Sequence, residues 1–189
     1  MSVDFDDLEL RLMREFLESA SSTEWMVAAL MMNYDGKSEL IAWMAAHPRL
    51  DRATASALFW YSQPGYYQRF RGEADVPPVN RAGWRNLRAL RDRVASGTVA
   101  VAGASFDPAN DSSKPTGNPN HPGQDWTAEA LGAQDDPGWL IPPLMFESVT
   151  GDDVDIRGYA EANGWVEGMP PTVLEELEAA WLNEGEDDE

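Results

Sequence analysis

The sequence predicts one mainly α-helical protein, in which a multi-helix first half continues into an irregular, acidic second half. Through most of the first hundred residues, apolar side chains recur at intervals of three or four, which is the spacing of one helix face. Of the 189 residues, 43% are hydrophobic, which is enough for one compact core. Residues 103–138 are instead dense in Gly, Pro, Asn and Asp, which interrupt regular structure. We therefore expect a helical domain over residues 1–97 and a loop-rich acidic extension over residues 98–189 that packs on it.

The first two helices are predicted from apolar spacing and from a cap. Apolar residues three or four positions apart run from Phe5 to Phe16, with acidic residues between them. Ser21 and Glu24 have the spacing of a capping box, in which each side chain accepts from the backbone N–H of the other residue. The run from Trp25 to Met32 is apolar nearly all round, so we expect this second helix to be buried at the centre.

Turn and cap residues separate the next two helices. The residues from Asn33 to Gly36 have the composition of a turn. A short helix follows around Leu40 to Met44, and Pro48 ends it because proline disfavours the α conformation in the residue before it. Asp51 is expected to cap a fourth helix, which the Pro64-Gly65 pair stops.

A fifth helix, expected to be capped by Asn80 and to end at Gly97, belongs to the only basic surface that the sequence predicts. Between residues 69 and 93 there are seven arginines against three acids. Two interpretations stay open: the arginines form a solvated helix face, or they dock the acidic half internally and offset part of its self-repulsion.

After residue 97 the predicted elements are short, apart from the last helix. They are a strand over residues 98–102, a helical turn pinned by Trp126 and Leu131, an extended packing segment over 139–146, and a helix over 154–163. A terminal helix is expected over about residues 171–184. We expect its apolar side chains to face the core: Val173, Leu174, Leu177, Trp181 and Leu182.

The charge is strongly negative and unevenly distributed. The net charge is −19; residues 1–100 hold 12 basic and 13 acidic side chains, whereas residues 101–189 hold 2 basic and 20 acidic ones. A field of this sign repels nucleic acid and anionic membranes and attracts basic proteins. We therefore expect a basic protein partner, no nucleic acid and no membrane; the sequence leaves the oligomeric state open.

Signatures of catalysis are missing from the sequence. There are no cysteines and two histidines, His47 and His121, and neither a nucleophile-elbow motif nor a glycine-rich phosphate loop occurs. We expect no catalytic residue, no metal site and no cofactor. The absence of cysteine, of a long apolar run and of a secretory leader favours the cytoplasm.

A pattern of turn, cap and aromatic residues runs from Asn33 to about Tyr67. It consists of Asn33-Tyr34-Asp35-Gly36, Ile41-x-Trp43, His47-Pro48, Asp51, Thr54-Ala55, Phe59-Trp60, and Pro64 with Tyr66. Over about residues 10–80 the chain resembles a small bacterial domain family of unknown function, whose members share an N-[WY]-D-x-G turn and a P-x-x-D-x-x-T-A-x-x-x-F-W segment. The resemblance implies a helical fold. Because such proteins sometimes occur beside toxin genes, it also implies an immunity role.

These observations lead to a non-catalytic binding protein as the main hypothesis. It would be an immunity protein or inhibitor that covers the cationic groove of a basic toxin, of the nuclease or deaminase type. The expected contact residues are acidic side chains of the second half with two tryptophan anchors. They are Asp125, Trp126, Asp135, Asp136, Trp139, Asp152, Asp153, Asp155, Glu175 and Glu176. The alternatives are a general interaction scaffold or a carboxylate- or metal-dependent enzyme, with His121 and Asp152–Asp155 at its site and residues 103–138 as a lid.

Overall fold

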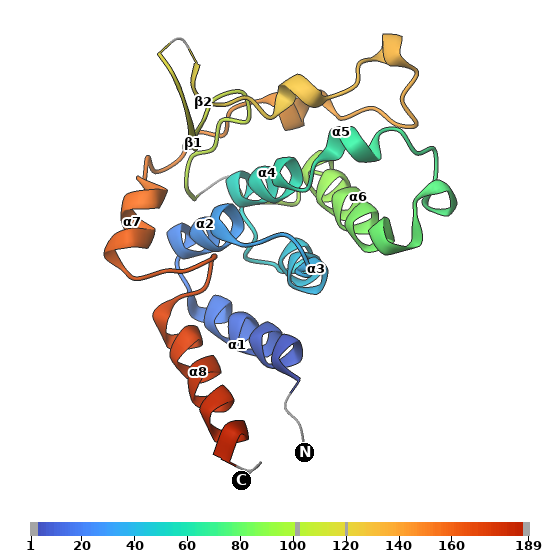
Figure 1. The fold of residues 1–189 in the computed structure, drawn as a ribbon. Coiled ribbons are helices and arrows are strands. Elements are labelled where there is room, and N and C mark those ends of the chain that lie inside the picture. Colours follow the sequence, from blue (N-terminus) through green and yellow to red (C-terminus); the bar gives the residue numbers. More distant parts are fainter. Residues whose placement is uncertain (1–3, 101–102, 120, 187–189) are drawn as a thin grey trace.

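The computed structural model describes residues 4–100, 103–119 and 121–186, and it confirms a mainly α-helical protein (Figure 1). The α-helices are α1 (Phe5–Ser19), α2 (Ser22–Met31), α3 (Ser38–Ala46), α4 (Arg52–Tyr61), α5 (Pro64–Tyr67), α6 (Arg81–Ala95), α7 (Ile156–Ala162) and α8 (Pro171–Glu186). The strands are β1 (Asp111–Asn118) and β2 (His121–Gln124). Short 3-10 helices are η1 (Glu73–Asp75), η2 (Pro78–Asn80), η3 (Thr127–Glu129), η4 (Ala133–Asp135) and η5 (Pro143–Phe146). Over the described residues, no helix combines the length and the apolar character needed to cross a bilayer.

The helix starts of the first half follow the predicted caps in two cases. The Ser21 backbone N–H donates to Glu24 Oε2 at 2.6 Å and the Glu24 N–H donates to Ser21 Oγ at 3.3 Å, which confirms the capping box of α2. Asp51 Oδ1 accepts from the Thr54 N–H at 2.8 Å and caps α4. Asn80 does stand at the start of α6, but its side-chain amide donates to the Tyr66 hydroxyl at 2.8 Å and does not cap the helix.

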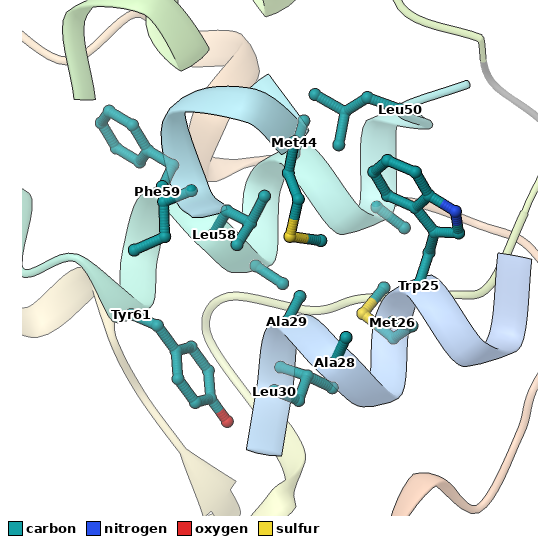
Figure 2. Close-up of a cluster of buried hydrophobic side chains, with 14 of the residues drawn as sticks. Trp25, Met26, Ala28, Ala29, Leu30, Met44, Leu50, Leu58, Phe59 and Tyr61 are labelled. Atoms are coloured by element: carbon teal, nitrogen blue, oxygen red, sulfur yellow. The ribbon is translucent and has the colours of Figure 1, made fainter. Parts of the chain in front are cut away.

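The core is built around α2 and α4. Helix α2 packs on α4, α4 packs on α6, and α6 packs on α3. Figure 2 shows how side chains from these helices meet: Trp25 and Met26 of α2 lie against Met44 of α3 and Leu58 of α4, and all four have at most 2% of their surface exposed. Nearly every residue of α4 is buried, and after Arg52 its sequence contains no charged residue.

Segments of the second half join the same core. Phe106, Trp139, Met145, Ile156 and Val173 are all buried in the cluster that contains the α2 and α4 side chains. Helix α7 packs on α2, and α8 runs beside α1 in the opposite direction (Figure 1). The hydrophobic core therefore does not stop at residue 97, and the division into a domain and an extension stays a prediction.

The segment over residues 103–138, expected as a loop, contains a β-hairpin. Strands β1 and β2 pair antiparallel, and the register shifts twice along the pair. Proline and glycine within both strands hid this hairpin from the sequence pattern, because both residues are unfavourable in strands. The helical turn expected near Trp126 is η3, which begins directly after it.

Three further expectations differ from the structure. In the strand expected over residues 98–102, Ala100 makes an isolated parallel bridge with Asp51, whereas residues 101 and 102 lie outside the described residues. The Pro64-Gly65 pair ends α4 but also begins α5, because proline suits the first turn of a helix. Trp181 and Leu182 do not face the core: they are 66% and 56% exposed, since α8 packs mainly on α1 and its earlier apolar residues are the ones that reach the cluster.

Candidate functional site

An open cleft of about 730 Å³ lies in the second half, at the base of the hairpin and beside the start of α7. We call it the acidic cleft, because its lining includes four carboxylates and one guanidinium. The charged lining residues are Asp107, Asp111, Asp153, Asp155 and Arg157. Leu30, near the end of the buried helix α2, also lines the cleft.

Backbone pairing of two distant segments builds one wall of the acidic cleft. Phe106 N–H donates to Val149 O at 3.0 Å, and Val149 N–H donates back to Phe106 O at 2.8 Å. A second pair of bonds joins residues 103–105 with Asp152 at 2.9 and 3.0 Å. Both Phe106 and Val149 are buried, so their side chains anchor the wall in the core while the neighbouring acids stay near solvent. Gly151 permits this approach, since a Cβ there would lie 2.2 Å from Gly103 O.

Two carboxylates of the acidic cleft are oriented by local backbone. Asp155 Oδ1 accepts from the Gly158 N–H at 3.0 Å and caps α7, which places a negative charge at the positive end of that helix. Asp107 Oδ1 accepts from the Ala109 N–H at 3.0 Å. Asp153 also lines the acidic cleft, and its side chain is exposed.

Asp111 is the buried carboxylate of the acidic cleft, with 3% of its surface exposed. Its Oδ2 accepts from the Tyr61 hydroxyl at 2.7 Å and from Trp126 Nε1 at 2.9 Å, and its Oδ1 accepts from the Ser113 N–H at 2.9 Å. These three donors satisfy a charge that would otherwise be costly to bury. Burial first, and then the negative charge of Asp111, raise the pKa of Tyr61 above its usual range, so the phenol stays a donor at neutral pH.

The expected contact residues fall into three regions, and the structure brings one group together at the acidic cleft. Asp153 and Asp155 line it, and the backbone of Asp152 belongs to its wall. Glu175 and Glu176 are exposed on α8, which lies away from the hairpin in Figure 1.

The third group covers the α4–α6 side of the molecule, and its side chains already have partners. Asp125 accepts from Thr127 Oγ1 at 2.6 Å, Asp135 accepts from the Gly132 N–H at 2.9 Å, and Asp136 pairs with Arg71 at 2.9 Å. Trp126 is half-buried against Asp111. Trp139 is only 8% exposed and donates from Nε1 to Tyr67 O at 3.1 Å, so little of its ring is open to a partner.

The arginines of the first half serve both of the roles left open. Arg71 bonds Asp136, and the Arg91 guanidinium lies 5.6 Å from the centroid of the Trp139 ring, so these two dock the second half. Arg85 instead pairs with Glu73 within the first half and is 61% exposed. Outside the predicted set, Arg52 also reaches across, to Glu147 at 2.9 Å.

Sequence reasoning missed Asp107, Asp111 and Arg157 as site residues. Asp111 lies in a run that reads as a loop, and nothing in the sequence links it to Tyr61, which is 50 positions away. Arg157 carried a signal, because it is one of two basic residues after position 100.

The two histidines belong to different elements of the fold. His47 is buried beside the rings of Trp25 and Trp43, and its Nε2 lies 3.3 Å from Glu18 Oε2. His121 belongs to β2. In the described part of the chain, no three His, Asp or Glu side chains are grouped so that they could hold a metal ion.

The comparisons with known proteins concern the helical half alone. No curated protein and no solved structure matches the chain. Residues 20–95, from the α2 cap to the end of α6, match the model of a family described as a domain of unknown function, DUF4274. These residues include the pattern from Asn33 to Tyr67. The residues that line the acidic cleft lie outside the match, except for Leu30.

Proposed function

We propose that this chain is a non-catalytic binding protein that captures a basic protein through the acidic cleft. Following the resemblance, the partner is a toxin of the nuclease or deaminase type, and the chain acts as its immunity protein by covering the cationic groove of the toxin. The observation that carries the proposal is the acidic cleft itself: three exposed or half-buried carboxylates, Asp107, Asp153 and Asp155, surround a hollow whose inner carboxylate is Asp111.

The size and charge of the acidic cleft suit a lysine or arginine side chain of a partner. Its volume of about 730 Å³ exceeds that of one such side chain, so a loop carrying the cation can enter with it. A carboxylate that meets a cation in a recess is less screened by salt than one on an open surface. The net charge of −19 adds long-range attraction, which raises the association rate with a basic protein.

The proposal is tested with paired baits that differ at one charge. Asp153→Lys reverses an exposed charge in the cleft lining, and Glu161→Lys makes the same change on an exposed residue of α7 outside that lining. Each bait is incubated with an extract of the source cell and eluted with a salt gradient. We expect one basic protein that the wild type and Glu161→Lys retain to high salt, and that Asp153→Lys releases at low salt.

The captured protein is then expressed alone and together with the chain. We expect toxicity that the wild type suppresses and that Asp153→Lys suppresses at least tenfold less well. Equal release by Asp153→Lys and Glu161→Lys would show that overall charge, and not the acidic cleft, holds the partner. If the captured protein is harmless when expressed alone, the proposed immunity role is wrong, but the proposed binding site is still supported.

A further inference from the structure

A second hollow, of about 480 Å³, lies wholly within the family-matched residues. Three segments surround it: the turn after α2 with the first half of α3, the stretch from the end of α4 through α5, and η2 with the first part of α6. We call it the tyrosine pocket, because four tyrosines line it. They are Tyr34, Tyr61, Tyr66 and Tyr67.

Hydrogen bonds fix three of these four rings. The Tyr34 hydroxyl donates to Ala29 O at 2.8 Å, and the Tyr61 hydroxyl donates to Asp111. The Tyr66 hydroxyl accepts from Asn80 Nδ2 at 2.8 Å. Because their polar ends are engaged, the rings keep one orientation, and Figure 2 shows Tyr61 at the margin of the buried cluster.

The rings are also fixed against each other in two pairs. The centroids of Tyr34 and Tyr61 lie 5.8 Å apart, and those of Tyr66 and Tyr67 lie 4.9 Å apart with the planes at 83°. Gly83 of α6 permits the second pair to sit against that helix, since a Cβ there would lie 2.3 Å from the Tyr67 hydroxyl oxygen. The aromatic walls are therefore formed before any ligand binds, which lowers the entropy cost of binding.

Backbone strain occurs in the wall of the tyrosine pocket. Gln63 joins α4 to α5 with φ 56° and ψ 59°, a left-handed conformation that is unfavourable for a residue with a side chain. Strain of this kind persists where the surrounding structure enforces it, and it concentrates at ligand sites.

The chemistry of the lining points to a cation. Among the described lining residues, Asp35 is the one acidic side chain, and the others are aromatic, apolar or neutral polar. The face of a tyrosine ring carries negative potential, so rings beside an acidic side chain attract an ammonium group. Lys114 Nζ already lies 5.7 Å from the centroid of the Tyr61 ring, so a further cation depends on the other three rings. We propose that the tyrosine pocket binds an organic ammonium cation, either a free small molecule or the side chain of a lysine presented by another protein. This inference does not rest on the proposed function: the two sites are joined by the bond from Tyr61 to Asp111, but none of the residues changed in the tests below lines the acidic cleft.

The probe is choline, and its matched control is 3,3-dimethylbutan-1-ol, which has the same shape without the charge. We expect saturable binding of choline to the full chain by isothermal titration, in the millimolar range, and at least tenfold weaker binding of the neutral alcohol. Equal binding of the two compounds would overturn the proposal, because the pocket would then recognise apolar shape alone.

Four variants locate the binding. Tyr66→Leu removes a ring face and is expected to weaken choline binding about fivefold, whereas Tyr66→Phe keeps the face and is expected to stay within twofold of the wild type. Tyr159→Leu removes a half-buried tyrosine of α7 outside the pocket and serves as the control. Asp35→Asn, at an exposed position, gives a second readout if Tyr66→Leu unfolds, with an expected two- to threefold loss.

A lysine peptide separates the two sources of the cation. If acetyl-lysine-methylamide and a short oligolysine bind in competition with choline and lose affinity in Tyr66→Leu, a protein side chain is the ligand. If choline binds but neither lysine compound competes with it, the ligand is a free small-molecule cation. Choline binding that survives Tyr66→Leu and Asp35→Asn unchanged would contradict the proposal, whatever the paired-bait experiment on Asp153 shows.

Discussion

The family-matched residues 20–95 and the described residues 103–186 share one hydrophobic core but differ in how their backbone is held. In the first region, helices bury whole apolar faces, and α2 and α4 are almost fully removed from solvent. Apart from α8, the second region has short elements and many exposed acids, and polar side chains of the first region also bind its backbone. Trp60 Nε1, for example, donates to Met145 O at 2.8 Å from inside the core. The comparison teaches that the helical region also acts as a template for the acidic one.

Gln68 is the clearest such contact. Its side chain has no exposed surface; Nε2 donates to Leu131 O at 3.0 Å and to Trp139 O at 3.2 Å, and Oε1 accepts from the Leu131 N–H at 2.8 Å. Its own backbone carbonyl accepts from the Gly138 N–H at 2.6 Å. One buried amide therefore satisfies three backbone groups of a segment that has little regular structure.

The largest expected effect is in the helical core. Leu58→Ala, at a fully buried position, should lower the free energy of unfolding by about 3 kcal/mol, because it removes apolar contact and leaves a cavity. The matched control Leu182→Ala, at a position that is 56% exposed, should change it by less than about 0.5 kcal/mol. Urea denaturation followed by circular dichroism measures both. Similar losses would mean that α8 contributes to the core as much as α4 does.

Gln68→Ala should act on the second region more than on the first. It leaves three backbone groups of residues 131 and 139 without their partner, at a cost of about 2–3 kcal/mol. Limited proteolysis with mass spectrometry should find faster cleavage within residues 125–147 while α2 and α4 stay protected. The exposed Gln134→Ala is the control. If both regions are cleaved at the same rate, they unfold as a single cooperative unit, and the expected difference between them does not exist.

A smaller effect is expected at the start of α2. Ser21→Ala removes one side of the capping box and should cost about 1 kcal/mol in urea denaturation. The neighbouring exposed residue Ser22 offers the control Ser22→Ala, which keeps the cap. If both substitutions cost the same, the capping bonds do not stabilise the helical region.

The smallest effect is a pH dependence at Asp51, where the first region meets the start of the second. Asp51 is 4% exposed, and its carboxylate lies so close to Gly103 that a Cβ there would be 2.3 Å from Asp51 Oδ2. Burial raises the pKa of Asp51, so the folded state binds its proton more tightly than the unfolded state does. Its contribution to stability is therefore complete below about pH 4 and is lost as the pH rises through the folded pKa. Asp51→Asn keeps the cap acceptor without titrating.

Urea denaturation of Asp51→Asn and the wild type at pH 4, 5, 6 and 7 measures this dependence. The variant should gain stability relative to the wild type as the pH rises. A constant difference across this range would show that the carboxyl group does not titrate abnormally in the folded state.

The sequence was informative where structure is local. The capping residues Ser21 and Asp51 and the apolar run of α2 predicted their elements, because each depends on neighbours within four positions. The hairpin was missed, since its strands contain residues that favour turns and are stabilised by pairing at a distance.

For the candidate sites, the sequence indicated some of the residues but did not predict which of them lie together in the fold. Asp153 and Asp155 were singled out from the acidic run, yet Asp111 gains its place from Tyr61 and Trp126, which no local pattern connects to it. The tyrosine pocket likewise joins three segments whose side chains are unremarkable one at a time. The expectation for Trp181 was wrong because apolar spacing shows that a face exists, not how far its neighbour extends.

The pairing of α1 with α8 has a consequence for synthesis. The first helix leaves the ribosome early, but the helix that covers part of its apolar surface is made roughly 150 residues later. At a synthesis rate of about 5–20 residues per second, that part of the α1 surface stays uncovered for roughly 8–30 seconds. During this interval the nascent chain exposes the kind of segment that chaperones bind, and a chain cut short before α8 would stay in that state. The packing of α1 is therefore completed only after α8 has been made.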